Sequence, residues 1–127
     1  MKATISYEGK RKFVAQCENG KIIFDLPLAL KGEGKGVTPP EAFAVSLAAC
    51  AGYYALFYCG EKGLSAEGMV ITMEAEKDAK RITHITTIIT LPNVDVEKHR
   101  DGLMKAVNNC LVKSSIETKP DIKIVFK

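Results

Sequence analysis

An uncharged run from Ala42 to Cys59 limits the folds open to this chain more than any other feature. At a helical rise of about 1.5 Å per residue, such a run is just long enough to span a bilayer. Six of its 18 residues are Ala, with Gly, Ser and three Tyr and only two Leu, and transfer of Ala, Gly and Ser into lipid gains little free energy. We therefore predict the central helix of a soluble protein and no membrane span.

A helix of this composition is apolar on every side, which has a consequence for assembly. A helix that is hydrophobic all round has to be covered all round. In a chain of 127 residues, one sheet and one further helix cover only part of its surface. We therefore predict a homodimer with the run 42–59 at its centre.

The start of this helix is marked by Thr38, Pro39 and Glu41. Thr38 is a good N-cap, Pro39 fits the first helical position, and Glu41 completes a capping box with Thr38. Stop signals follow the run, so the helix is predicted to end between Gly60 and Gly63.

The segments on both sides of the helix have the pattern of β-hairpins. Alternating positions in them are rich in β-branched and aromatic residues. Asn19-Gly20 has the left-handed preference of a tight turn, and a charged turn is predicted at 78–80. Five strands are predicted, in residues 2–8, 11–17, 21–26, 68–78 and 81–92.

The C-terminal part is predicted to form one further helix and one strand. Helical periodicity over 94–116 follows an Asp95 cap and places Leu103 and Cys110 on one apolar face. Alternation in 121–127 predicts a final strand. The order βββ-α-ββ-α-β gives an α+β fold, with helices packed on largely antiparallel sheets.

Length and composition exclude several classes of protein. The chain fits one domain over residues 1–127, and its 46% hydrophobic and 26% charged residues are ordinary for a soluble protein. The net charge of +3 comes without a basic cluster interleaved with aromatics, so no nucleic-acid partner is predicted. The first residues lack the apolar run of a secretory signal, and a cytoplasmic location is expected. The Gly-rich segment 30–40 lacks the lysine–Ser/Thr ending of a phosphate-binding loop and is predicted to be a connector.

Four cysteines are the candidate chemical groups, and in the cytoplasm they are expected to be reduced thiols. No CxxC pair occurs and neither His84 nor His99 is near a cysteine in sequence, so no metal or other cofactor is predicted. Cys50 stands out, because its small neighbours allow another backbone or a substrate to come close. A free Cys is also a common buried residue, which is the alternative for Cys50 and the prediction for Cys17 and Cys59.

A reactive Cys50 needs a group that lowers its pKa, because the thiolate is the nucleophile. Cys50 lies twelve residues after Thr38, too far for the dipole of its own helix to act. A cation from elsewhere in the fold is therefore expected. If the two helices pack, Cys110 is placed to condense with a sulfenate at Cys50. The candidate cations are Lys10, Arg11, Arg81 and Arg100.

Two motifs of this chain are similar to those of the OsmC/Ohr family of thiol-dependent hydroperoxide reductases. TPPEAFAVSLAAC at 38–50 resembles the central-helix motif of that family, and CLVKSSI at 110–116 resembles its second-cysteine motif, usually Cys-Pro-Val-Ser-x-Ser-Leu. The predicted strand–helix order resembles the family over essentially the whole chain.

The resemblance implies an intertwined homodimer with active sites at its interface, acting as an antioxidant in the response to oxidative stress. Cys50 would be the peroxidatic nucleophile and Cys110 the resolving thiol, with Arg11 and Glu41 as candidates for the activating pair. The substrate would be an organic hydroperoxide, and a dithiol reductant, dihydrolipoamide-like or thioredoxin-like, would restore the thiols without a metal or flavin. The apolar pocket would be formed by residues such as Phe43, Tyr53, Tyr54 and Phe57.

The chain departs from the family pattern at several positions. The activating glutamate of the family lies ten residues before the cysteine, where this chain has Pro40, and Glu41 is only nine residues before Cys50. Leu111 and Lys113 stand where the second motif usually has Pro and Ser. These departures leave open the alternative of an OsmC-like protein without peroxidase activity, which binds a small apolar or electrophilic ligand at the dimer interface.

Overall fold

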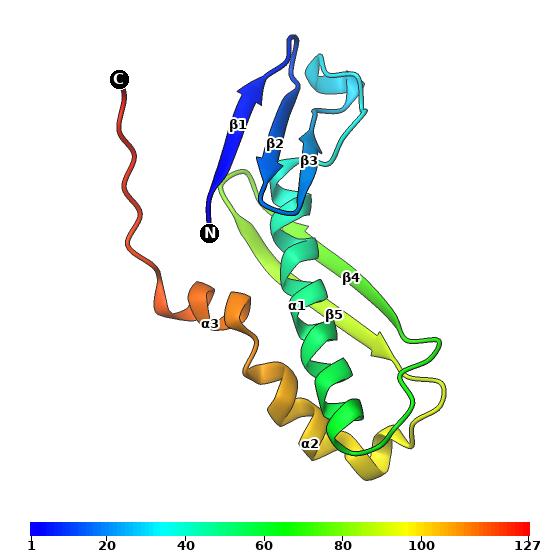
Figure 1. Cartoon of the computed structure of the whole chain (residues 1–127). Helices are drawn as coiled ribbons and strands as arrows, with labels where there is room; N and C mark the ends of the chain where they lie inside the picture. The colour runs from blue at the N-terminus through cyan, green and yellow to red at the C-terminus, as the bar shows by residue number, and fades with distance from the viewer. The chain divides into compact units, whose positions relative to one another are not determined.

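The computed structural model describes residues 1–127, which form two compact units. Unit 1 is Met1–Phe43 and unit 2 is Ala44–Lys127. Each unit has its own antiparallel sheet, and the helices lie mainly in unit 2 (Figure 1). The predicted α+β class is confirmed, while one domain over residues 1–127 stays a prediction.

Unit 1 contains a three-stranded sheet in the order β1-β2-β3. The β2–β3 hairpin turns through Glu18 and Asn19, because Cys17 pairs with Gly20 and makes Gly20 a strand residue. Neither Asn19 nor Gly20 has a positive φ, so the left-handed turn predicted there is wrong. The strands agree with the three predicted for this part: β1 Ala3–Tyr7, β2 Phe13–Cys17 and β3 Gly20–Phe24.

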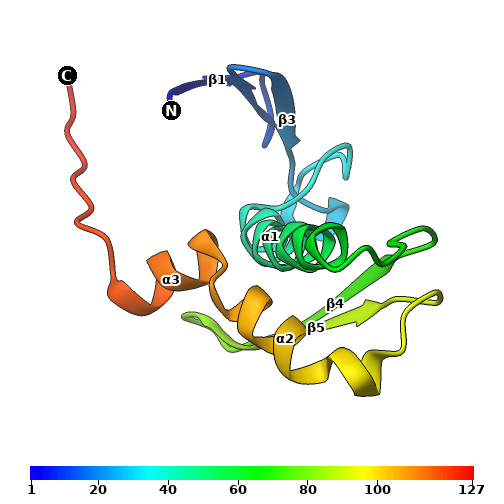
Figure 2. The same ribbon diagram turned by 60° about the horizontal axis from the view of Figure 1, so that its bottom comes forward.

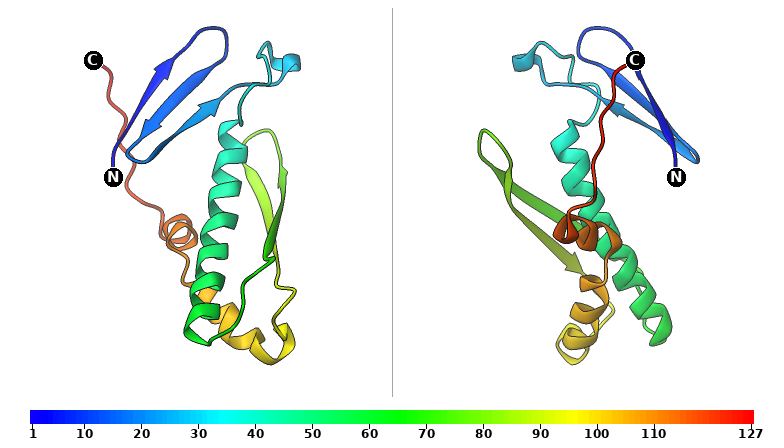
Figure 3. Two further views of the ribbon diagram at one scale, coloured as in Figure 1. Left: turned by 45° about the vertical axis from the view of Figure 1, so that its right-hand side comes forward. Right: turned by 90° about the vertical axis from the view of Figure 1, so that its left-hand side faces the viewer.

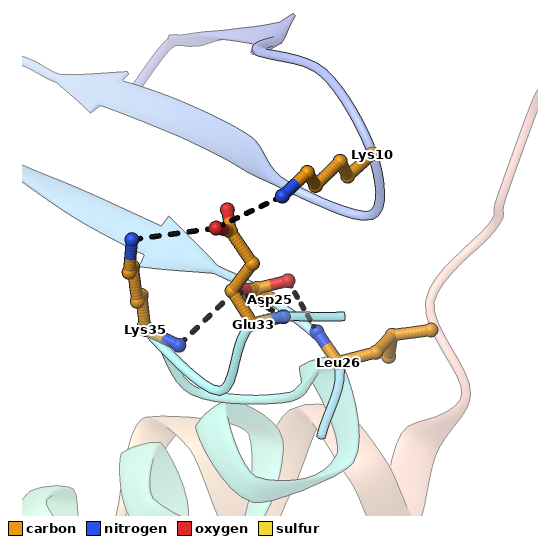
Figure 4. A network of polar contacts seen from close by, with 5 residues as sticks. All are labelled: Lys10, Asp25, Leu26, Glu33 and Lys35. Atoms are coloured by element: carbon orange, nitrogen blue, oxygen red, sulfur yellow. Dashed lines mark hydrogen bonds and ion pairs between the residues drawn. The ribbon is translucent and has the colours of Figure 1, made fainter. Parts of the chain in front are cut away.

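A buried carboxylate holds the loop that follows β3 and contains the short 3-10 helix η1, Leu28–Leu30 (Figure 4). Asp25 is 2% exposed and accepts the N–H groups of Leu26, Glu33 and Lys35 at 2.8, 3.2 and 3.1 Å. The N–H of Lys35 lowers the pKa of Asp25 most, burial raises it, and the other two N–H groups bring it further below its ordinary value. Because an anion of the chain itself occupies these donors, the Gly-rich loop is built as a connector.

Helix α1, Pro39–Glu61, begins with the predicted capping box. Glu41 Oε2 accepts the N–H of Thr38 at 2.8 Å, and Thr38 Oγ1 accepts the N–H of Glu41 at 3.4 Å. Gly63, two residues after the helix, has a φ of 65°, the left-handed conformation that ends many helices. Both predicted ends of the helix are therefore confirmed.

A stripe of small residues on α1 packs against the sheet of unit 2. This sheet consists of β4, Val70–Lys77, and β5, Ile82–Thr90, paired antiparallel as predicted. Gly52 permits the close approach, because a Cβ there would overlap the side chain of Ile71. Helix α1 thus lies along one face of the β4–β5 sheet (Figure 2). The buried residues of the stripe are Ala44, Ala48, Gly52, Ala55 and Cys59.

The remaining surface of α1 is apolar and exposed, with Val45, Tyr53 and Phe57 more than half exposed. By length and composition α1 is apolar enough to cross a membrane, because an 18-residue stretch of it has a mean hydropathy of 1.6, and 28% of that stretch is buried. The core helix of a soluble protein can have the same length and hydropathy. Unit 2 covers one side of this helix and leaves the others uncovered.

The helix predicted over 94–116 is two helices, α2, Val96–Asn108, and α3, Leu111–Thr118 (Figure 3). Asp95 is the N-cap of α2 as predicted, and its Oδ1 accepts the N–H of Lys98 at 3.2 Å. The helix is interrupted at Cys110, whose φ of −54° and ψ of 124° are extended. Periodicity misses this break because apolar residues resume at helical spacing after it. Cys110 is therefore the N-cap of α3 and not a mid-helix residue.

Helix α2 completes the core of unit 2, where Leu103 joins Ala55, Cys59 and Leu91. The chain after α3 has no regular structure, and Ile122, Ile124 and Phe126 are 78%, 78% and 97% exposed. The strand predicted in 121–127 is absent, because an extended segment becomes a strand only when it pairs with another edge.

Candidate active site

Cys50 and Cys110 meet within unit 2, although they are 60 residues apart in sequence. Cys50 is half-buried on α1, and Cys110 is 1% exposed directly before α3. The two thiols act on one another's pKa, and neither is in a disulfide. A disulfide between Cys50 and Cys110 stays a prediction.

The first turn of α3 favours the thiolate form of Cys50. The backbone N–H groups of Val112 and Leu111 lower the pKa of Cys50, and the N–H of Lys113 donates to Cys110 Sγ at 3.4 Å. The first N–H groups of a helix have no partner within the helix, and the helix dipole favours a negative charge beside them. Cys50 is thus placed at the N-terminus of a helix other than its own.

These contacts move the pKa values of the two thiols in opposite directions. Burial raises the pKa of Cys50, but hydrogen bonds from Cys110 and from the N–H groups of Val112 and Leu111 outweigh burial and bring it below the ordinary value. Burial also raises the pKa of Cys110, and its hydrogen bond to Cys50 raises it further. Hydrogen bonds to the charged form favour that form, so Cys50 is the group that ionises first and Cys110 is the one that stays a thiol.

The cation expected beside Cys50 is not among the groups of unit 2 that lower its pKa, which are a thiol and two backbone N–H groups. Arg100 on α2 instead pairs with Glu97. A cation from elsewhere in the fold that acts on Cys50 stays a prediction.

The other predicted site residues belong to unit 1. Lys10 pairs with Glu33 at 3.1 Å, Arg11 is exposed in the turn between β1 and β2, and Glu41 takes part in the capping box. A contribution of Lys10, Arg11 or Glu41 to the chemistry of Cys50 stays a prediction.

An apolar cavity of about 260 Å³ lies between α1, β5 and α2. Its walls include Ala51, the neighbour of Cys50 in sequence, and Val107, whose carbonyl accepts the N–H of Cys110 at 3.2 Å. Arg100 is the charged residue of its lining. The cavity therefore offers a mainly apolar space beside α1, which carries Cys50, and beside the end of α2, which precedes Cys110.

The aromatic residues predicted to form a pocket are distributed differently. Tyr54 and Phe57 line a separate hollow of about 540 Å³ together with Lys62 and Lys105. Tyr53 is 61% exposed on α1. Neither thiol lines this hollow, and an aromatic substrate pocket formed by Phe43, Tyr53, Tyr54 and Phe57 stays a prediction.

The remaining cysteines have different surroundings from the pair. Cys59 is fully buried in the core, and burial raises its pKa, which confirms the prediction of a structural residue. Cys17 is half-buried at the end of β2 in unit 1. The reactive surroundings in unit 2 are those of Cys50 and Cys110.

Comparison with known proteins decides the family. The family model of OsmC-like proteins matches residues 32–125. The chain belongs to the OsmC-like protein family. Comparison with curated proteins finds no match.

Solved structures of OsmC-like proteins share the fold of this chain. An OsmC-like protein from Mycoplasma pneumoniae is 16% identical with a TM-score of 0.76, over 93% of this chain and 87% of that one. The organic hydroperoxide resistance protein OhrB of Bacillus subtilis is 21% identical with a TM-score of 0.63, over 97% and 96% of the two chains. An organic hydroperoxide resistance protein OsmC from Legionella pneumophila is 19% identical with a TM-score of 0.62, over 97% and 94%. At these identities the structures establish the OsmC/Ohr fold.

Proposed function

We propose that this OsmC-like protein is a thiol-dependent peroxidase that reduces organic hydroperoxides in the cytoplasmic response to oxidative stress. The observation that carries this proposal is the pairing of Cys50 and Cys110 in unit 2, where the pKa of Cys50 is lowered and that of Cys110 is raised from the ordinary value. A reactive cysteine beside a resolving cysteine is the arrangement that peroxide reduction needs. Membership of a family that includes organic hydroperoxide resistance proteins supports the same activity.

In the first step, the Cys50 thiolate attacks the oxygen of ROOH that carries the hydrogen. The O–O bond breaks, its electron pair leaves with the RO oxygen, and Cys50 becomes a sulfenic acid. The alkoxide takes a proton from water and leaves as the alcohol ROH. Both electrons that reduce the peroxide come from the sulfur of Cys50.

In the second step, Cys110 attacks the sulfur of the Cys50 sulfenic acid. The S–O bond breaks, and the OH group leaves as water with the proton of the Cys110 thiol, so that a Cys50–Cys110 disulfide remains. An external dithiol, dihydrolipoamide-like or thioredoxin-like, then reduces this disulfide by thiol exchange and is itself oxidised to a disulfide. Arg11 and Glu41 are proposed as the residues of unit 1 that assist the first step.

Apolar surfaces in unit 2 suit both the substrate and a second copy of the chain. The cavity of about 260 Å³ has room for a small organic group close to Ala51 and Val107. The exposed side chains of Val45, Tyr53 and Phe57 form an apolar face on α1 that an isolated soluble chain rarely leaves uncovered. We propose that the working form is a homodimer in which the second copy covers this face.

The test of this function is thiol mass spectrometry after one equivalent of cumene hydroperoxide. We expect a disulfide between Cys50 and Cys110, one equivalent of cumyl alcohol and no free hydroperoxide. Cys17→Ser is the matched control, because it removes a thiol outside the pair and should give the same disulfide. If Cys50 and Cys110 both stay reduced while the peroxide persists, the proposed activity is wrong.

A second function is favoured by Pro40, which stands where the family usually has its activating glutamate. Without that carboxylate, Cys50 would serve to bind a small apolar or electrophilic ligand at the dimer interface. The same mass measurement distinguishes the two functions. Binding predicts that an α,β-unsaturated carbonyl compound adds to Cys50, whereas cumene hydroperoxide leaves both thiols reduced.

A further inference from the structure

A hollow of about 540 Å³ lies between the C-terminal half of α1 and the C-terminal half of α2. Hollows of this size bind small organic molecules in many proteins. It shares no lining residue with the cavity beside Arg100, and neither thiol lines it. Its lining includes three aromatic residues and two lysines, which are Tyr54, Phe57, Tyr58, Lys62 and Lys105.

The aromatic part of this lining is held in place by its neighbours. The hydroxyl group of Tyr58 lies 2.9 Å from Nδ1 of His99 on α2. Gly102 permits the Tyr58 ring to lie against α2, because a Cβ at position 102 would overlap that ring. Tyr54 and Phe57 meet edge to face, with ring centroids 6.0 Å apart. Rings that are fixed before a ligand arrives can hold a flat aromatic ring at little cost in conformational entropy.

Two ammonium groups accompany these rings. The Nζ of Lys62 lies 5.9 Å from the centroid of the Tyr58 ring, and Lys105 lines the hollow from α2. Neither lysine pairs with a carboxylate of the chain, and the lysines that do so are Lys10, Lys35 and Lys113. Glu61 is the acidic residue of the lining, so the two lysines leave the hollow with a net charge of +1. An organic anion with a single charge therefore complements it.

We propose that the hollow between α1 and α2 binds a small aromatic carboxylate, with its ring on the three aromatic side chains and its carboxylate paired with Lys62 and Lys105. The rings provide the apolar contact, and the ammonium groups select for the negative charge. A phosphate monoester complements the hollow less well, because its second negative charge is repelled by Glu61. This site goes beyond the proposed peroxidase function and does not depend on it, because no thiol takes part in the binding.

The hollow lies next to the segments that carry the two thiols. Tyr54 follows Cys50 by four residues, about one helical turn, so the two lie on the same face of α1. On the other side, Asn109 lines the hollow and directly precedes Cys110. Phe57 also belongs to the apolar face proposed for contact with a second copy. A bound carboxylate would therefore lie at the edge of that face, and its binding has to be measured on the protein in its native assembly.

The experiment is a fluorescence titration of the wild-type protein with 2-naphthoate, a fluorescent aromatic anion with one charge, at neutral pH. The matched probes are 2-naphthalenemethanol, which is neutral, and 2-naphthyl phosphate, which carries a second charge. We expect saturable binding of 2-naphthoate, about fivefold tighter than that of 2-naphthalenemethanol, as expected for partly exposed ion pairs. 2-Naphthyl phosphate should bind more weakly than 2-naphthoate.

Three lysine variants locate the carboxylate. Lys62→Gln and Lys105→Gln each remove one charge from an exposed side chain, so the fold should be retained. Each should weaken 2-naphthoate binding by about two- to fivefold and leave the affinity for 2-naphthalenemethanol unchanged. Lys98→Gln is the matched control, because Lys98 is an exposed lysine of α2 outside the hollow, and it should bind 2-naphthoate like the wild type.

Several results would overturn this site. Absence of saturable 2-naphthoate binding to the wild type, or equal 2-naphthoate affinity of the wild type and both hollow-lysine variants, would reject it. If Arg100→Gln loses 2-naphthoate binding while Lys62→Gln and Lys105→Gln retain it, the ligand occupies the cavity beside Arg100 and the site is again rejected. Tighter binding of 2-naphthyl phosphate than of 2-naphthoate would reject the carboxylate as the ligand. None of these results depends on whether the protein reduces cumene hydroperoxide.

Discussion

The starts of α1 and α3 satisfy the same backbone requirement with different groups. At α1, the cap is made by neighbours in sequence, since Thr38 and Glu41 bond to one another's N–H groups at 2.8 and 3.4 Å. At α3, the sulfur of Cys110 accepts the N–H of Lys113, and the N–H groups of Val112 and Leu111 lower the pKa of Cys50, which is 60 residues from Cys110 in sequence. The N–H groups at the start of α1 bond to residues of the same segment, whereas two N–H groups at the start of α3 act on Cys50 of another helix.

The start of α1 therefore has a structural role, whereas the start of α3 takes part in the proposed chemistry of Cys50. The bonds of the α1 cap join two neighbouring residues of one segment, Thr38 and Glu41. The charge on Cys50 depends on pH and on its oxidation state, so the donors at the start of α3 bind a partner that changes during the proposed reaction. Substitutions at each start should therefore give different kinds of effect.

The largest expected effect comes from replacing the sulfur atom of Cys50 or Cys110 with oxygen. Cys50→Ser should reduce cumene hydroperoxide consumption to the rate of buffer, because a serine hydroxyl at neutral pH is not an effective nucleophile towards peroxide. Cys110→Ser should retain one turnover and accumulate a Cys50 sulfenic acid, which dimedone labelling detects. If Cys50→Ser consumes peroxide at the wild-type rate, Cys50 is not the nucleophile and the start of α3 has no part in the chemistry.

The pH dependence of Cys50 sharpens the comparison further. Because the folded structure lowers the pKa of Cys50, its alkylation by iodoacetamide should reach its plateau at lower pH in the native protein than in the urea-unfolded protein. The linked stability has the same sign: this ionisation stabilises the fold above the unfolded-state pKa, and the contribution disappears as the pH falls through the folded-state pKa. A native plateau at higher pH than in urea would contradict the role of α3.

The start of α1 was predictable from sequence because its signal is local. Thr38, Pro39 and Glu41 are adjacent in sequence, and together they specify the cap. The sequence also predicted both hairpins and the end of α1. These features depend on short segments and on motifs that this chain retains.

The start of α3 was not predictable in the same way. Periodicity joined α2 and α3 into one helix, because the break at Cys110 leaves the apolar spacing nearly intact. The groups of α3 that lower the pKa of Cys50 are backbone N–H groups. Every residue except proline has one, so residue types do not reveal them. The predicted strand in 121–127 failed for a related reason, since alternation does not reveal whether an edge is available for pairing. Sequence reasoning thus missed the features that depend on contacts between segments distant in sequence.

A smaller effect is expected from breaking the cap of α1. Thr38→Ala should lower the free energy of unfolding by about 1 kcal/mol, as measured by urea denaturation, because one side-chain cap is lost. Its peroxide reduction rate should equal that of the wild type. A change in the pKa of Cys50 in Thr38→Ala would mean that the two helix starts are coupled.

Glu41→Gln tests whether the start of α1 also takes part in the chemistry. Glutamine can form the same capping box, so stability should stay close to that of the wild type while the charge is removed. A slower peroxide reduction in Glu41→Gln would give Glu41 the catalytic part predicted from sequence and break the comparison. An unchanged rate would assign it to the cap.

The smallest expected effect concerns the ion pair on α3 between Lys113 and Glu117. Glu117→Gln leaves the ammonium of Lys113 unpaired in the first turn, where it favours the Cys50 thiolate but opposes the helix dipole. We expect faster alkylation of Cys50 at neutral pH by less than about twofold, and no difference at 1 M salt, where the screening length is about 3 Å. Glu97→Gln is the matched control, because it frees Arg100 on α2 instead. Equal effects of the two substitutions would mean that Cys50 responds to net charge and not to the start of α3 in particular.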